Sequence, residues 1–221
     1  TFTDDASVFE ANGGKINTLF GEERNLKITT QQDLNIAEIL WLKLVLFLNF
    51  KLAKKDSIAI NNLLQKSFPE VKYKRRDYFK QTPHYRILAK ENDTLIGHVG
   101  LDYRVMNLGS SPIKVLVLID ICIYSSHREN GIGEKLLQKA DKLSLEFSER
   151  IDFLFLVTNT PNYFEKYGFR RVEPTTTWLK IHQHKNYGVG TEKIDDTHFM
   201  IKSINDKKWD GENLDLLGYM Y

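Results

Sequence analysis

Residues 121–134 read ICIYSSHRENGIGE, and this stretch decides the fold. An apolar strand pattern runs into a polar loop, and Gly131 and Gly133 then open a segment whose apolar residues recur at helical spacing. Glycine lets a backbone approach a ligand closely, and the free N–H groups and dipole of a first helical turn attract negative charge. The stretch therefore predicts a strand, a turn and a helix with an anion site that suits a diphosphate. Taken alone, the two glycines fit an ordinary helix start equally well.

The segments before this unit predict further strands. Residues 113–124 form a long run rich in Val and Ile, which is typical of a central strand buried on both faces. Residues 85–90 and 94–105 predict a hairpin around a turn at 91–93. Residues 42–52 fit either a strand or a core helix, and we favour a strand because an amphipathic helix capped by Asp56 follows it.

The segments after the helix predict strands at 151–157 and 170–172 and a last strand at 197–204. Between the first two of these strands, Pro161 opens a short helix that ends at Gly168. Strands and helices in this order predict an α/β (α+β) fold with a mixed sheet flanked by helices.

The composition fits one domain of ordinary size. The 221 residues are 42% apolar with a formal net charge of +2, so nothing favours nucleic acid or an acidic membrane as a partner. The most apolar run, residues 39–50, is shorter than the ~20 residues that cross a bilayer. The chain starts without a signal pattern, and its single cysteine, Cys122, allows no internal disulfide. We expect a soluble, cytoplasmic protein, with residues 1–40 as an extension or peripheral elements and residues 41–221 as the domain.

Two motifs make the chain resemble the GNAT superfamily of acyl-CoA N-acyltransferases. The first, R/Q-x-x-G-x-G/A between a strand and a helix, reads RENGIG at residues 128–133, with Ile121 and Ile123 at the expected distance upstream. The second, aromatic-E-K-x-G-F, reads FEKYGF at residues 164–169. The resemblance covers roughly residues 41–172. It implies a mostly antiparallel sheet in which a splayed pair of central strands holds coenzyme A.

The resemblance also implies acetyl-CoA as the co-substrate and direct attack by an amine, without an enzyme nucleophile. Backbone N–H groups of the turn would hold the pyrophosphate, and the preceding strand would pair with the pantetheine arm. The cofactor-binding residues so implied are Ile121, Cys122, Ile123, Arg128, Glu129, Asn130, Gly131, Ile132, Gly133, Glu134, Asn159 and Phe164. The Cys122 side chain itself is expected in the core. Two alternatives stay open: a longer acyl donor, and a non-catalytic domain that binds coenzyme A or a partner protein.

The catalytic acid is where the sequence departs from the family. Many members carry, at the position of Phe164, a tyrosine that protonates the leaving thiolate. Here Tyr163 after a small register shift, Tyr167 from the other side, or no dedicated acid would have to serve. For the base, Asp120 is costly in an apolar strand unless it is functional or paired, for example in fixing a bulge. His98, on the preceding strand, is the second candidate because its ordinary pKa lies near neutrality, although a lone strand histidine is often structural.

The sequence specifies the acceptor only loosely. The distal part resembles the tail of aminoglycoside 2'-N-acetyltransferases, and the strand segments also resemble nodulation N-acyltransferases. The candidates for a site that binds a cationic amine are Asp195, Asp196, Trp209, Asp210 and Asp215. A solvated polar tail explains these residues equally well. No metal site is expected, because His182 and His184 have no further ligand nearby. The expected partners are an acyl-CoA donor and a small-molecule or peptide amine, with a homodimer left open.

Overall fold

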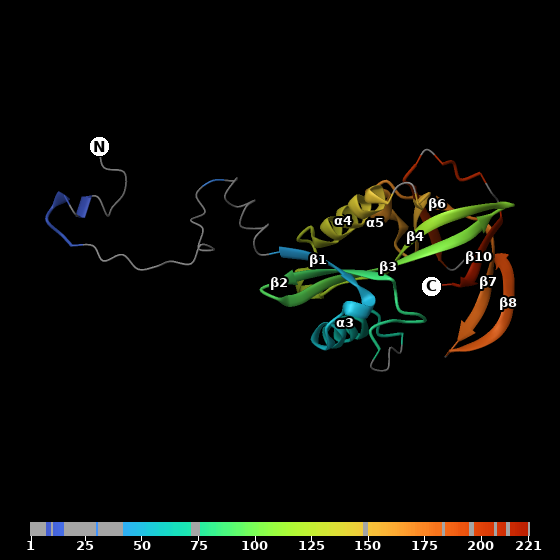
Figure 1. Cartoon of the computed structure of the whole chain (residues 1–221), viewed down its shortest axis with the longest axis horizontal. Coiled ribbons are helices and arrows are strands. Elements are labelled where there is room, and N and C mark those ends of the chain that lie inside the picture. The colour runs from blue at the N-terminus through green and yellow to red at the C-terminus, as the bar shows by residue number, and fades with distance from the viewer. Residues whose placement is uncertain are drawn as a thin grey trace. The chain divides into compact units, whose positions relative to one another are not determined.

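The computed structural model describes residues 8–9, 11–15, 30, 42–71, 76–147, 150–182, 184–194, 197–205, 207–210 and 213–220. The chain divides into two compact units, Thr1–Trp41 and Leu42–Tyr221. The second unit consists of one large sheet with a few helices packed against it (Figure 1). Within the described residues, no helix is both long and apolar enough to cross a membrane.

The second unit contains ten strands and three α-helices among its described residues. The strands are β1 (Leu42–Leu48), β2 (Tyr85–Glu91), β3 (Thr94–Leu108), β4 (Ser111–Ile123), β5 (Phe153–Thr158), β6 (Arg170–Val172), β7 (Thr175–His182), β8 (Lys185–Lys193), β9 (His198–Ser203) and β10 (Asn213–Tyr219). The helices are α3 (Lys54–Ser67), α4 (Ile132–Glu146) and α5 (Pro161–Glu165), with short 3₁₀ turns at Asn49–Lys51 (η1) and Ser125–His127 (η2).

The strands form a mixed, mostly antiparallel sheet in the order β6-β9-β5-β4-β3-β10-β7-β8, and β2 and β1 extend it from the first half of β3. Among the strands that the structure describes, only the pairs β4–β5 and β10–β7 are parallel. The β4–β5 pair needs a crossover connection, which α4 supplies. The predicted fold class is therefore confirmed, and β4 lies at the centre of the sheet with the β2–β3 hairpin beside it.

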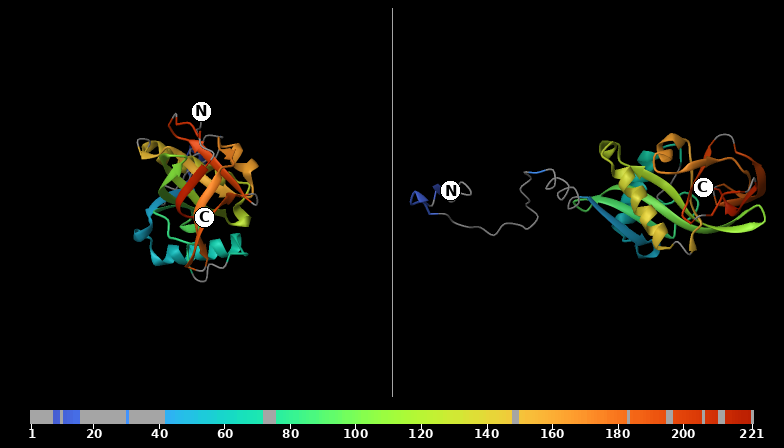
Figure 2. Two further views of the ribbon diagram at one scale, coloured as in Figure 1. Left: turned by 90° about the vertical axis from the view of Figure 1, so that its right-hand side faces the viewer. Right: turned by 90° about the horizontal axis from the view of Figure 1, so that it is seen from above.

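The core consists of layers on both faces of the sheet. Along β2, Ile87 and Ala89 face the apolar stripe of α4, whereas Leu88 faces α3. This alternation is the period of a strand that is covered on both sides. Figure 1 and the left view of Figure 2 show α3 in cyan and α4 in yellow on opposite sides of the sheet. The two helices fix the position of β4 and, with it, the loops at both ends of α4.

Three predicted details are wrong. Helix α3 begins at Lys54 after Ala53, so Asp56 is not its cap but a buried residue of its first turn. Strand β9 is not the last strand, because β10 follows it. The pattern also missed the hairpin of β7 and β8. Strand β8 is almost fully exposed and has no apolar period, and it pairs with the neighbouring strand β7. Strand β10 alternates over only two buried residues, Leu214 and Leu216, and it pairs with β3 and β7, which are distant in sequence.

Removing the Asp56 carboxylate should destabilise the domain strongly. Lys90 Nζ lies 2.7 Å from Asp56 Oδ1, and both side chains are only 8% exposed. The change Asp56→Ala leaves a buried ammonium without its anion, so we expect a loss of about 3 kcal/mol or more in urea unfolding.

The matched control is Asp141→Ala, which breaks the pair of Asp141 with Lys202. Those side chains are 29% and 26% exposed, so the loss should be about 1 kcal/mol or less. The double change Asp56→Leu with Lys90→Met should recover most of the stability, because no charge is then buried. Equal losses in the two single variants would contradict the assignment.

Candidate active site

Strand β4 carries a bulge in the middle of the sheet. Gly100 pairs with Ile119 and His98 with Cys122, so β4 has one residue more than β3 over this interval. The extra residue brings Asp120 to a φ of 51°, in the left-handed region that Asp tolerates better than most residues. A bulge of this kind bends its strand and redirects the neighbouring side chains.

A buried pair of side chains holds the bulge from behind. Arg86 can only donate hydrogen bonds, so its Nη1 donates to His98 Nε2 over 2.9 Å. The proton of the neutral imidazole is therefore on Nδ1, which donates to the carbonyl oxygen of Asp120 over 2.9 Å. Arg86 Nε also donates to Asn49 Oδ1 (2.6 Å), and its Nη2 lies 3.5 Å from a carboxylate oxygen of Asp77. This chain of contacts connects three segments to the backbone of the bulge.

These contacts contradict the expectation that His98 faces the cleft as a base. His98 is fully buried, and both of its ring nitrogens are engaged. Burial and the neighbouring Arg86 lower the pKa of His98 to about 3, so the ring is neutral near pH 7. The structure gives His98 the role of positioning the bulge.

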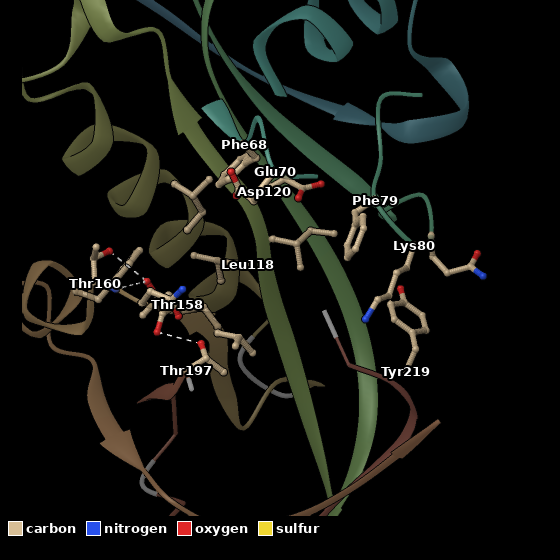
Figure 3. Close-up of a pocket in the computed structure, with 17 residues that line it drawn as sticks. Phe68, Glu70, Phe79, Lys80, Leu118, Asp120, Thr158, Thr160, Thr197 and Tyr219 are labelled. Carbon is tan, nitrogen blue, oxygen red and sulfur yellow. Dashed lines mark hydrogen bonds between the residues drawn. The ribbon is translucent and has the colours of Figure 1, made fainter. Parts of the chain in front are cut away.

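The central strands separate beyond a short paired region. Strands β4 and β5 pair only over Val115–Val117 and Phe153–Phe155 along their described lengths. Past this point a cavity of about 480 Å³ is lined by both strands. Figure 3 shows its wall: Leu118, Ile119, Asp120 and Ile121 of β4, Leu156 to Thr160 of β5 and the loop after it, Phe164 of α5, and residues from four other segments. The Thr197 hydroxyl donates to the carbonyl oxygen of Thr158 at the base of this wall.

The structure places the predicted strand and loop residues in two groups. Ile121, Asn159 and Phe164 line the cavity. Cys122 instead packs under α3 with Leu88, and burial together with the charge of Asp120 raises the pKa of its thiol. The Cys122 side chain therefore belongs to the core and is not a nucleophile.

The glycine turn follows β4 and the short 3₁₀ turn η2. Glu129 and Gly131 have φ values of 67° and 71°, and α4 begins at Ile132 after Gly131. The first N–H groups of a helix have no partner within it, here those of Ile132 to Glu134, and Gly131 supplies no side-chain cap for them. Arg128 closes the loop by donating from Nε to the carbonyl oxygen of Ile123 over 3.3 Å. The described turn thus has the form of an anion site at a helix start.

Tyr163 lies beside this turn. Its hydroxyl occupies the space that a side chain at residue 133 would need, which explains the glycine there. Its ring contacts those of Phe164 and Tyr167 edge to face, with centroids 5.1 and 5.3 Å away. Burial and the Tyr167 hydroxyl raise the pKa of Tyr163 to about 12. Among the described residues of α5, Phe164 rather than Tyr163 lines the cavity.

Of the residues proposed for a cationic acceptor, those that the structure describes do not line the cavity. Asp195 and Asp196 lie outside the described residues. Trp209 packs edge to face on Phe153, with centroids 5.5 Å apart, and Asp215 Oδ1 accepts the N–H of Leu217. His184 contacts Arg76, and the described part of the chain holds no group of three residues suited to a metal ion.

The sequence did not reveal most of the cavity lining. Five of these residues matter for the charge and shape of the cavity: Phe68, Glu70, Phe79, Lys80 and Tyr219. The first four lie between α3 and β2 without regular structure, and the fifth lies on the strand that the pattern did not reveal. No periodicity marks such positions, because only tertiary packing brings them to the cavity.

The model of the acetyltransferase (GNAT) family matches residues 57–169, just over half of the chain. The chain therefore belongs to the GNAT acetyltransferase family.

Solved structures agree at the level of the fold. An acyl-CoA N-acyltransferase from Pseudomonas aeruginosa is 15% identical over 73% of this chain and 99% of its own, with a TM-score of 0.51. A GNAT family N-acetyltransferase from Escherichia coli, solved with CoA, is 12% identical over 79% and 90%, with a TM-score of 0.51. An aminoglycoside 6'-N-acetyltransferase complexed with coenzyme A is 16% identical over 74% and 99%, again with a TM-score of 0.51. At these identities the likeness concerns the fold alone.

The first residues resemble a different family. The model of 2-C-methyl-D-erythritol 4-phosphate cytidylyltransferase matches residues 1–43. The enzyme of that name from Trichodesmium erythraeum is 56% identical over 41 residues, which make up 19% of this chain and 18% of that protein. The chain thus spans about a fifth of the length of this curated relative. This match ends at residue 43, close to the boundary between the two compact units at residues 41 and 42.

The stability of the domain should fall in acid because of His98. Its pKa is about 3 in the folded chain and about 6.5 ordinarily, so unfolding takes up a proton below pH ~6.5. The stabilisation from the neutral ring is present above pH ~6.5 and is lost as the pH falls towards about 3, by up to ~1.4 kcal/mol per pH unit.

The change His98→Asn removes this titration, because an amide can still donate to Asp120 without gaining a charge. We expect urea unfolding of the variant to depend less steeply on pH between about 6 and 4 than that of the wild type. Carboxylates titrate in both proteins, so the difference in slope isolates His98. If the unfolding free energies of the two proteins changed equally with pH, the His98 ring would not be held neutral in the folded chain.

Proposed function

We propose that this protein is an N-acetyltransferase that transfers an acetyl group from acetyl-CoA to a primary amine by direct attack. The observation that carries the proposal is the cavity between the separated strands β4 and β5, with the bulge at Asp120 in its wall. Strand β4 runs from this bulge to the glycine turn at the start of α4. A long ligand with a diphosphate at one end and a reactive group at the other fits this arrangement.

The donor would bind along β4. The N–H groups at the start of α4 would hold the pyrophosphate. The backbone groups of β4 beyond Val117, which have no strand partner in β5, would pair with the amides of the pantetheine arm. Ile121, Asn159 and Phe164 would surround the thioester, because all three line the cavity.

The chemistry follows from the groups at the bulge. The amine nitrogen attacks the thioester carbonyl, a backbone N–H of the bulge stabilises the developing oxyanion, and Asp120 accepts the proton that the nitrogen loses. The C–S bond breaks, and coenzyme A leaves as a thiolate. A thiol ionises near pH ~8.5, so the thiolate of coenzyme A is a good enough leaving group to depart without being protonated. No proton donor is therefore needed at the position of Phe164. Tyr163 lies too near the glycine turn to serve the cavity from its present rotamer.

The change Gly131→Asp should abolish coenzyme A binding, because it places bulk and negative charge at the diphosphate site. Gly109→Asp is the matched control. Gly109 has a φ of 59°, close to the 71° of Gly131, and both have open space where a Cβ would be. The two changes therefore introduce the same residue under similar backbone strain. Calorimetric titration should show coenzyme A binding in the control and at least a ~10-fold weaker affinity for Gly131→Asp. Equal affinities would contradict the site.

The change Asp120→Asn should lower kcat by a factor of about 10²–10⁴ and leave coenzyme A affinity intact. Asn tolerates the left-handed backbone of residue 120 as Asp does, so the bulge should survive. The rate of thiol release with an amine acceptor measures the effect. The deficit should shrink as the pH approaches the pKa of the amine, because more acceptor is then already deprotonated. A deficit that stays constant over pH 7 to 10 would argue against a base.

Phe164 supports one alternative function, a domain that binds coenzyme A without catalysis, because phenylalanine has no hydroxyl group to act as an acid. A panel of amines with acetyl-CoA separates the two functions. Tight binding of coenzyme A without thiol release for any amine would identify the non-catalytic domain, and thiol release with an amine would exclude it. Longer acyl-CoA donors in the same assay report the acyl chain that the cavity accepts.

A further inference from the structure

The cavity carries charges of both signs. Two carboxylates, Asp120 and Glu70, and one ammonium, Lys80, are among the residues that line it. In the view of Figure 3 the labels of Asp120 and Glu70 lie on one side of the cavity, and those of Lys80 and Tyr219 lie on the other. A ligand that fills the space between them meets a negative end and a positive end.

The negative end lies where the amine must react. Asp120 is on the bulge of β4, and Glu70 follows the end of α3. Two carboxylates that face one cavity attract an ammonium group. Because Asp120 lies on β4, where the proposed thioester would bind, this attraction places the ammonium group beside the thioester. This end of the cavity suits the amino group of the acceptor.

The positive end is unusual because its charge has no anion in the described part of the chain. Lys80 forms no ion pair there, and Nζ donates to the backbone carbonyl of Met220. Burial lowers the pKa of Lys80, with no neighbouring carboxylate to oppose that effect. An ammonium that loses water without gaining an anion is costly, unless a ligand supplies the anion.

An aromatic wall lies beside Lys80. The Phe79 ring centroid is 5.3 Å from Lys80 Nζ, and Tyr219 is fixed on the other side. The Tyr219 hydroxyl lies 3.5 Å from Asp102 Oδ2, and the guanidinium of Arg104 lies 4.9 Å from its ring centroid. These contacts hold Tyr219 in place, and the two rings offer apolar area between the charged ends.

We infer that the acceptor is a small amine that also bears a carboxylate, such as an amino acid. Its ammonium group lies between Asp120 and Glu70, its carboxylate pairs with Lys80, and its side chain lies against Phe79 and Tyr219. A cavity of about 480 Å³ has room for such a molecule together with the acetyl end of the donor. This inference rests on the proposed acetyl transfer and specifies its acceptor. A polycation without a carboxylate would place positive charge against Lys80 and is disfavoured.

Matched acceptors test the inference. L-phenylalanine and phenethylamine differ by one carboxylate, as do L-lysine and cadaverine. Thiol release from acetyl-CoA gives kcat/KM for each, compared at a pH corrected for the fraction of free amine. We expect the carboxylated member of at least one pair to be preferred by about 10-fold or more, which equals ~1.4 kcal/mol.

The change Lys80→Met should remove this preference by raising KM for the carboxylated acceptor about 10-fold, with little effect on the amine that lacks the carboxylate. Lys80→Arg should retain most of the preference, because it keeps the charge. Lys142→Met is the matched control, since Lys142 is exposed on α4 and does not line the cavity. A structural role of Lys80 alone would change both members of a pair equally and would overturn the inference.

Two failures can be told apart. Equal or better transfer to the amines without a carboxylate overturns the acceptor assignment and leaves the acetyltransferase function standing. Absence of transfer to every amine, in protein that binds coenzyme A, overturns the proposed function itself. Calorimetric binding of the amino acid to the wild type but not to Lys80→Met, in the presence of coenzyme A, supports the acceptor site independently of turnover.

Discussion

The hydrogen bond from His98 to the carbonyl oxygen of Asp120 is the contact on which the site depends. A left-handed residue in a central strand is strained, and a free carbonyl behind it would be buried without a partner. His98 satisfies that carbonyl, and Arg86 keeps the ring in the one tautomer that can do so. Strands β4 and β5 cease to pair after Val117, and the bulge follows in the wall of the cavity that opens there. The buried pair of Arg86 and His98 therefore supports this wall from behind.

The charged residues of the site have two separate roles: one supports the backbone of the bulge, and the other takes part in the proposed reaction. Arg86 is buried and acts through His98, whereas Asp120 presents its carboxylate to the cavity from the residue that the pair holds. Burial lowers the pKa of the Arg86 guanidinium, and the attraction of Asp77 and then of Asp120 opposes this effect. One residue thus serves both the backbone geometry and the proposed proton transfer. The proposed dual use would account for an acidic side chain in this largely apolar strand.

Much of the fold could be predicted because its central elements repeat with clear periods. The apolar run of β4, the helical stripe of α4 and the turn between them are local features, and both motifs of the family lie within or next to them. The Asn92-Asp93 turn was also predictable, since both residues adopt the positive φ that a tight hairpin needs. The β7–β8 hairpin was not, because the Thr, Lys and Gly residues of β8 lie on an exposed strand without an apolar period. Strand β10 was not, because its alternation covers only Leu214 and Leu216 and its strand partners are distant in sequence.

In the candidate site too, features formed by neighbouring residues were predictable and features formed by distant segments were not. The sequence by itself determined the family, the glycine turn at the start of α4 and the presence of an acidic residue in the central strand, because each depends on residues that are adjacent in the chain. Only the tertiary structure decided that His98 lies behind the bulge instead of in the cleft, that Phe164 rather than Tyr163 faces the cavity, and that Glu70, Lys80 and Tyr219 surround it. Those placements depend on contacts between segments far apart in sequence, and side-chain direction at such contacts is set by packing, which no local pattern encodes.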